Sequence, residues 1–489
     1  MLNLHTRAPF GKHEFIFLVL SVLFVLAIAI PCCLDFSKGW IDEKYSGCNE
    51  RIGIDFLMRY NEISCVRDGI NPYAVQIGDA KSKQYRYYLA PEEFPSQQIL
   101  GTYSPWSYTY FGWLTLFGRR TAWKVYYGLM VVALGGILWA VCRYARNRGC
   151  SWRRAGSYAL GAALLVQYGV SSCFYVGNYG LILAASLCVF LWALDREKPI
   201  AAGLAWAIMM TKPQMGIMLA IPLLMQRQFK VCFIAVVTCL LCSVPPAILS
   251  STNLLDLIIA VPQSGVDAAT QTKLLPGSLM HLMSRWVPMS ALNLLQAGFG
   301  VVLCAVLTWR LKSCPWPWVR YLPAVVVGNY CLYSLSHNDC TFIVAIGVLL
   351  AVVERAQRRE LTRWMVFACV CLGCFYCQLI LSHPAWGIVN IFGFSWPETS
   401  RVYWVASLIH HAATWAFLAA FCRLVWLLGD TPAPRHVSAV DISQSNGLKA
   451  ESKADNIFIS PPKPPLSPPA NPATASTRPS WPTKPSTPP

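Results

Sequence analysis

Ile54-Asp55-Phe56-Leu57-Met58-Arg59-Tyr60-Asn61-Glu62, followed by Asp68-Gly69-Ile70-Asn71-Pro72-Tyr73, places several carboxylates after an apolar segment long enough to span a membrane. Apolar residues recur along the first stretch at helical spacing, at Ile54, Leu57, Met58 and Ile63. This spacing predicts a short interfacial helix on which Asp55, Arg59 and Glu62 share one face, one to two turns apart. A solvated loop with ordinary surface charges is the alternative interpretation.

The composition around this stretch is that of a membrane protein. The chain has 489 residues, of which 55% are hydrophobic and 13% charged, and its mean hydropathy is +0.44. This leaves too little polar surface for a soluble globule of that size. Apolar runs of roughly 16 to 22 residues recur, as helices that cross a bilayer require, whereas a transmembrane barrel would show short alternating segments. The net charge of +17 lies in short Lys and Arg clusters between these runs, so we expect cytoplasmic loops and no nucleic-acid partner.

The chain begins with Arg7 and Lys12 before an apolar segment at about 15–34. We interpret this start as a signal-anchor with a cytoplasmic N-terminus; a cleaved signal peptide is the alternative. Residues 35–103 then form a predicted long outer loop. This loop holds ten of the 23 acidic residues, namely Asp35, Asp42, Glu43, Glu50, Asp55, Glu62, Asp68, Asp79, Glu92 and Glu93. Cys48 and Cys65 also lie in it, either as a disulfide or as free thiols.

Further spans are predicted at about 123–141, 156–172, 180–194, 229–249, 292–311, 318–333, 340–353, 364–381 and 403–427. The apolar run at 199–225 is broken at Lys212-Pro213, because proline disfavours helix in the residue before it. We therefore expect two half-spans that meet at an outer turn. The sum is an all-α fold of about twelve transmembrane helices or half-helices, with both termini cytoplasmic.

The membrane part is expected to cover residues 1–428. From 429 to 489 the composition changes to Pro, Ser, Thr and Ala, which predicts a disordered cytoplasmic tail with some polyproline II. Most of the 20 cysteines fall inside apolar runs, where a thiol acts as a small hydrophobe, so no metal site is predicted. An aromatic stretch from Tyr103 to Phe117 suits a headgroup-level belt or a re-entrant segment.

Ionisable residues at membrane depth mark the candidate site: Lys212, His337 and Asp339. Lys212 alone is also explained as a snorkelling residue, and His337 as a structural one. However, the topology places Asp55, Lys212 and His337 on the same side. A proton-accepting carboxylate, a cation for a phosphate and an imidazole are suited to group transfer.

Short motifs in the chain resemble the GT-C superfamily of membrane glycosyltransferases, and within it family 87, the polyprenol-phosphate-mannose-dependent mannosyltransferase type. Asp55 with Gly69-Ile70-Asn71-Pro72-Tyr73 resembles the acidic residue of the first loop and its G-x-x-P-Y. The other similar elements are Tyr103-Ser104-Pro105, Gly177-Asn178-Tyr179-Gly180-Leu181, Ala201-Ala202-Gly203-Leu204 through Thr211-Lys212-Pro213, and Ser336-His337. Ser104 stands where the family has proline, and Asn178 and Gly180 where it has Gln and Asn.

The resemblance implies inverting transfer of a hexosyl group, expected to be mannosyl. The donor would be a polyprenyl-phosphate sugar, and the acceptor a glycolipid or glycan on the outer face of the plasma membrane, as in a bacterial inner membrane. It also implies roles for eight residues: Asp55 as general base; Lys212, His337 and Asn178 as ligands of the donor phosphate or sugar; and Arg59, Tyr73, Tyr103 and Asp339 as acceptor contacts or loop support. No metal or other cofactor is expected. The main alternative is a transporter or flippase of a lipid-linked sugar, which would show matched broken helices in its two halves; a scaffold for polymer assembly is the third candidate.

Overall fold

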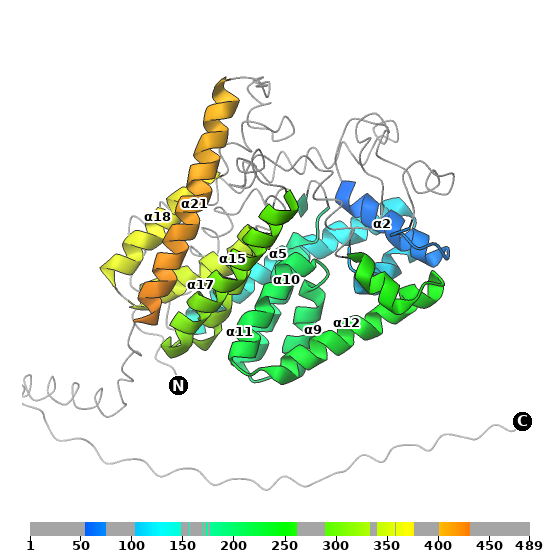
Figure 1. Ribbon diagram of the computed structural model, residues 1–489, viewed down its shortest axis with the longest axis horizontal. Coiled ribbons are helices and arrows are strands. Elements are labelled where there is room, and N and C mark those ends of the chain that lie inside the picture. Colours follow the sequence, from blue (N-terminus) through cyan, green and yellow to red (C-terminus); the bar gives the residue numbers. More distant parts are fainter. Residues whose placement is uncertain are drawn as a thin grey trace, which may run out of the picture. The chain divides into compact units, whose positions relative to one another are not determined.

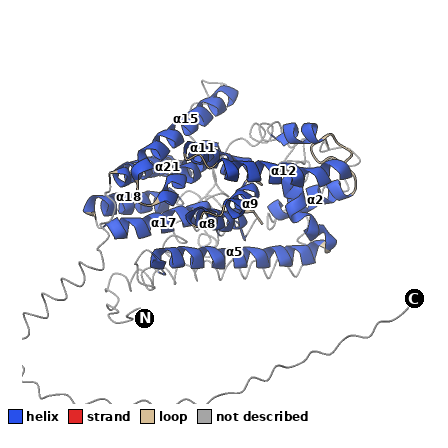
Figure 2. Cartoon of the chain, turned by 90° about the horizontal axis from the view of Figure 1, so that it is seen from below, coloured by secondary structure: helices blue, strands red, loops and turns tan. Residues whose placement is uncertain are grey.

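The computed structural model describes residues 54–74, 103–147, 156, 170, 173–174, 177–261, 289–332, 340–356, 358–375 and 401–430 (Figure 1). Within these ranges every regular element is a helix (Figure 2), which confirms the all-α class for this part of the chain. Several predictions lie outside the described residues. They concern the first apolar segment, most of the 35–103 loop, Cys48, most of the 156–172 span, His337, Asp339 and the tail beyond 430.

The helices are α2 (Ile54–Arg67), α4 (Pro105–Phe111), η2 (Gly112–Leu116), α5 (Arg119–Asn147), α8 (Gly180–Asp195), α9 (Pro199–Met209), α10 (Pro213–Gly216), η3 (Ile217–Leu219), α11 (Ala220–Met225), α12 (Phe229–Leu249), α15 (Met289–Arg310), η4 (Leu311–Ser313), η5 (Pro317–Tyr321), α16 (Leu322–Leu332), α17 (Cys340–Ala356), α18 (Arg359–Phe375) and α21 (Arg401–Gly429).

In the part of the chain that the structure describes, three helical segments are long and apolar enough to cross a membrane: Thr121–Asn147, Phe229–Leu249 and Leu294–Ser313. They coincide with predicted spans, and large apolar side chains such as Val132 and Phe233 are exposed on them. Such exposure is expected where a helix faces lipid, because lipid tails replace water there. The protein is therefore a membrane protein, while the total of about twelve crossings stays a prediction.

The predicted break at Lys212 is present. Helix α9 ends at Met209, Lys212 is extended with φ −113° and ψ 93°, and Pro213 is the first residue of α10. This is the conformation that a following proline favours, and proline itself is well tolerated at the first helical position. Helix α9 packs against both α8 and α12, and α10 and α11 continue the chain beside them (Figure 1).

Helix α2 ends at a glycine. The amide of Ile70 donates to the carbonyl of Cys65 at 2.8 Å, and that of Gly69 to Val66 at 3.1 Å. These two hydrogen bonds form a Schellman motif, and Gly69 supplies the positive φ of 79° that the motif needs. The glycine of the G-x-x-P-Y element is thus a helix stop.

The aromatic stretch after Tyr103 is largely enclosed by protein. Trp106 and Tyr108 of α4 are 8% and 3% exposed, whereas Trp113 and Leu116, in or beside η2, are more open at 39% and 81%. A headgroup-level belt would expose its Trp and Tyr rings, so the enclosed first half of this stretch does not form one, and the re-entrant interpretation stays a prediction. The first half is enclosed because α4 packs against both α2 and α12.

Candidate active site at the break between two half-helices

Two predicted site residues, Asp55 and Lys212, meet at the side-chain amide of a third, Asn178. Asn178, in the turn before α8, donates from Nδ2 to Oδ2 of Asp55 in α2 at 2.6 Å. Its Oδ1 accepts from the ammonium of Lys212 at 2.7 Å and from the amide of Gly180 at 3.1 Å. Because both donors face the same oxygen, the orientation of the Asn178 amide is determined by its partners. Asn178 therefore bridges a carboxylate and an ammonium group.

The three side chains differ in their burial. Asn178 is 1% exposed and Lys212 is 3% exposed, while Asp55 is partly open. A lysine is rarely buried to this extent without a partner, so its contact with Asn178 stabilises it in place. The more open Asp55 is the member of the cluster that an incoming molecule can reach.

A close approach of backbone brings Asn178 to Asp55. Gly177 has φ 75°, and a Cβ placed on it would lie 2.6 Å from Cβ of Phe56, the neighbour of Asp55. A side chain here would therefore collide with α2, and only glycine adopts this φ without strain. The turn is held from behind by the carbonyl of Cys173, which accepts from the amides of Gly177 at 2.9 Å and Asn178 at 3.2 Å.

The ring of Tyr103 lies between α2 and the helix break. The guanidinium carbon of Arg59 is 3.5 Å from the ring centroid, and Nζ of Lys212 is 5.5 Å from it. Both distances suit cation–π attraction. Tyr103 also packs edge-on against Tyr179 with ring centroids 5.3 Å apart. One aromatic ring thus interacts with two cations near Asn178.

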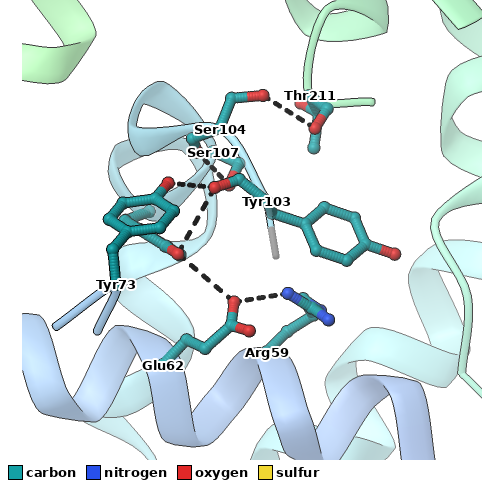
Figure 3. A network of polar contacts seen from close by, with 8 residues as sticks. Arg59, Glu62, Tyr73, Tyr103, Ser104, Ser107 and Thr211 are labelled. Atoms are coloured by element: carbon teal, nitrogen blue, oxygen red, sulfur yellow. Dashed lines mark hydrogen bonds and ion pairs between the residues drawn. The ribbon is translucent and has the colours of Figure 1, made fainter. Parts of the chain in front are cut away.

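A buried ion pair supports this ring from below. Arg59 and Glu62 pair through Nη1 and Oε2, and Glu62 is fully buried (Figure 3). The hydroxyl of Tyr108 lies 3.4 Å from the same carboxylate oxygen and 3.4 Å from the carbonyl of Tyr103, so it can donate to either. Burial by itself lowers the pKa of Arg59, but the charge of Glu62 opposes it and the net pKa is raised. Arg59 therefore stays charged.

Tyr73, the last residue of the G-x-x-P-Y element, ties the loop after α2 to the same place. Its hydroxyl donates to the carbonyl of Tyr103 (Figure 3). Its backbone amide donates to Oδ1 of Asn71 at 3.0 Å. Burial raises the pKa of the Tyr73 hydroxyl, so it remains a protonated donor. The element thus fixes Tyr103 from the α2 side.

Ser104 holds the other side of this segment. Its hydroxyl lies 2.9 Å from the carbonyl oxygens of both Met210 and Thr211, at the end of α9 (Figure 3). A single hydroxyl proton serves one of them at a time. A proline at position 104 would lack this hydroxyl, so the departure from the family's Tyr-Pro-Pro pattern provides a direct link to the residues before Lys212.

The two other carboxylates near Asp55 are placed differently. Glu62 is enclosed with Arg59, and Asp68 is exposed at the end of α2, where it accepts from Nε of Arg67 at 3.1 Å. Sequence reasoning missed the burial of Glu62 and the parts played by Tyr108 and Ser104. The spacing of Arg59 and Glu62, three residues apart on a helix, was a usable signal for their pairing.

The cysteines and the possible metal ligands were also considered in the sequence. Cys65 is buried and forms no disulfide with another described cysteine; Cys48 lies outside the described residues, so the pairing of Cys48 with Cys65 stays a prediction. Within the described ranges no group of three His, Cys, Asp or Glu side chains is arranged to hold a metal ion.

Comparisons with known proteins bear on this arrangement. The family model of glycosyltransferase family 87 matches residues 102–382, which is more than half of the 489-residue chain. The matched region contains Tyr103, Asn178 and Lys212 and begins after Asp55. Asp55 is connected to it through its hydrogen bond with Asn178. Comparisons with curated proteins and with solved structures gave no match.

Proposed function

The chain belongs to glycosyltransferase family 87 and is a membrane glycosyltransferase, and from this premise we propose that its donor is a polyprenyl-phosphate hexose. The acceptor is a hydroxyl of a glycolipid or glycan on the outer face of the plasma membrane, and transfer inverts the anomeric carbon. Mannose is the sugar to test first, and a bacterial inner membrane is the expected location. The observation that carries the proposal is the Asp55–Asn178–Lys212 bridge.

Asp55 acts as the general base in this proposal. Its carboxylate takes the proton of the acceptor hydroxyl while that oxygen forms a bond to the anomeric carbon. Asp55 is partly open, in contrast to the enclosed Glu62, and its Oδ2 is oriented by Asn178. Among the described residues no hydrogen bond to its Oδ1 is present, so this oxygen is suited to face the acceptor.

Lys212 stabilises the leaving group. As the bond from the anomeric carbon to the phosphate oxygen breaks, negative charge grows on the polyprenyl phosphate, and a pre-placed ammonium lowers the energy of that charge. A single phosphate needs less charge compensation than a diphosphate, so no obligatory metal is required. The side-chain amide of Asn178 bonds to both Asp55 and Lys212 and so fixes the base relative to the cation. His337 is proposed as a further ligand of the donor.

Arg59, Tyr73 and Tyr103 are proposed as loop support rather than acceptor contacts. All three are at most 8% exposed; Arg59 pairs with Glu62, and the hydroxyl of Tyr73 donates to the carbonyl of Tyr103. Tyr73 and Arg59 hold the ring of Tyr103 in place, and this ring contacts the cations of Arg59 and Lys212. Asp339 lies outside the described residues and keeps its proposed supporting role.

Transfer by the purified protein in lipid nanodiscs tests the function. A panel of polyprenyl-phosphate hexoses is offered with a glycolipid acceptor, and the product is identified by mass; nucleotide sugars and polyprenyl-diphosphate sugars are the controls for donor class. We expect a new glycosidic bond with a polyprenyl-phosphate donor alone. Movement of the donor across a liposome membrane without any product would contradict transfer and favour the flippase.

The outer placement of the site is tested separately. A cysteine introduced as Lys81→Cys, in the 35–103 loop, should react with an impermeant maleimide in intact cells, relative to the parent protein. Labelling only after permeabilisation would place this loop in the cytoplasm and contradict an outward-facing acceptor site.

A further inference from the structure

Two cysteines from distant parts of the chain meet behind the Asn178 turn. Sγ of Cys173 and Sγ of Cys340 are 3.3 Å apart, although 167 positions separate them in the sequence. Both side chains are fully buried. A disulfide has a sulfur–sulfur distance of about 2.05 Å, so a movement of about 1.3 Å closes the bond. This pair is distinct from the Cys48 and Cys65 pair that the sequence suggested.

We propose that Cys173 and Cys340 are a site of disulfide modification that fastens the Asn178 turn to the start of α17. Cys340 is the first residue of α17, and the carbonyl of Cys173 holds the amides of Gly177 and Asn178. A covalent link at Cys173 therefore restrains the backbone from which Asn178 reaches Asp55 and Lys212.

The chemistry is thiol–disulfide exchange with an oxidoreductase or a small molecule in its disulfide form. One cysteine thiolate attacks the donor disulfide and forms a mixed disulfide, which expels the first donor thiolate. The second cysteine thiolate then displaces the other donor sulfur. The protein pair loses two electrons and two protons, and both sulfurs of the donor end as thiols.

The source of oxidant follows from the placement of the site. Cys173 lies between the predicted spans at 156–172 and 180–194, in the turn that brings Asn178 to Asp55, and Cys340 follows His337, which the predicted topology places on the same side as Asp55. With the site on the outer side, both sulfurs lie toward the compartment in which disulfides persist. This step rests on the proposed outward-facing function. The pairing itself rests on the 3.3 Å distance and the burial of both sulfurs.

Differential alkylation of the full-length protein tests the proposal. Membranes are denatured in N-ethylmaleimide without reductant, then reduced, labelled with an isotopically heavy maleimide, digested and analysed by mass spectrometry. A second sample is first exposed to diamide with gentle warming, so that local openings expose the sulfurs. We expect heavy label at Cys173 and Cys340, and in the unreduced digest a linked peptide that lacks two hydrogen atoms.

Cys239 and Cys314 serve as internal controls, because both are buried free thiols and should take the light label. In the single variant Cys340→Ser, Cys173 should return to the light label. Complete light labelling of both Cys173 and Cys340, in the isolated and the diamide-treated protein, would overturn the proposal. So would a linked peptide that joins Cys173 to another cysteine.

The effect of the Cys173–Cys340 disulfide on the Asn178 site is measured by the transfer rate. Oxidation should change the transfer rate reversibly in the wild-type protein and leave it unchanged in Cys340→Ser. If no transfer is found with any donor, the linked peptide still decides the modification, so that failure of the function and failure of the disulfide are distinguishable. A linked peptide with an unaltered transfer rate would overturn the coupling to Asn178.

Discussion

Replacing Asp55 by asparagine separates the chemistry of this carboxylate from its packing. In Asp55→Asn the new side chain keeps the shape of the old one, and its carbonyl oxygen can still accept the hydrogen bond from Nδ2 of Asn178. The bridge to Lys212 is therefore expected to persist. What disappears is the ability to take a proton from the acceptor hydroxyl.

The expected losses of rate and of stability are very different in size. General-base help contributes about two to four orders of magnitude, so the activation free energy should rise by about 3 to 5 kcal/mol. For stability, a hydrogen bond to a charged group is exchanged for one to a neutral group, which costs about 1 kcal/mol. Asp55 is partly open to solvent, which reduces that cost further. Turnover should therefore collapse in a protein that still folds.

Single-turnover transfer with the best donor of the panel measures the rate, and thermal unfolding in the same detergent measures the stability. Asp68→Asn is the matched control, because Asp68 is exposed at the end of the same helix and should retain near-normal turnover. Donor binding to Asp55→Asn should be unchanged. Near-normal turnover of Asp55→Asn, with loss in Asp68→Asn or Glu62→Gln, would refute the assignment of the base. Normal turnover in all three variants would show that none of these carboxylates is the base.

The remaining predictions concern three side chains near this base. Lys212→Ala should lower kcat/KM by about a hundredfold and raise the KM for the donor more than the KM for the acceptor. Lys212→Arg should recover part of this loss. Unchanged kinetics for both substrates would leave Lys212 as a snorkelling residue. Glu62→Ala leaves the buried charge of Arg59 uncompensated and should destabilise the fold by about 3 to 5 kcal/mol, as measured by thermal unfolding. The double variant Arg59→Met, Glu62→Leu should recover much of the lost stability. A small effect of Glu62→Ala would show that the ion pair is solvated. Burial, together with the charges of Glu62 and Asp68, raises the pKa of the Cys65 thiol to about 12. Between pH 7 and 9 this thiol should therefore stay neutral and resist maleimide in the folded protein; rapid labelling before denaturation would contradict this.

The positions of several helices were predictable because hydropathy and helical spacing are local properties. The apolar run at 229–249 became α12 with the same bounds, and the run at 292–311 became most of α15. The helix after Ile54 was predicted from the spacing of its apolar residues. The break at Lys212-Pro213 followed from the restriction that proline places on its predecessor.

The partners within the site were decided by contacts between distant segments. Asp55, Arg59 and Glu62 were expected to share one helical face, but the structure places Asp55 against Asn178 and encloses Glu62 with Arg59. Helical spacing gives the side of a helix on which a residue lies, whereas the packing of α4 and of the Gly177 turn decides which neighbour it meets.

By itself, the sequence determined that this is a helical membrane protein with a break at Lys212, and its motifs pointed to family 87. Only the tertiary structure decided that Asn178 bridges Asp55 and Lys212, that Ser104 ties its segment to the end of α9, and that Cys173 meets Cys340. The physical reason is that burial in a bilayer and the geometry of proline act along the chain, residue by residue. A hydrogen bond across 123 positions depends on where a glycine lets two backbones touch, which no local pattern encodes.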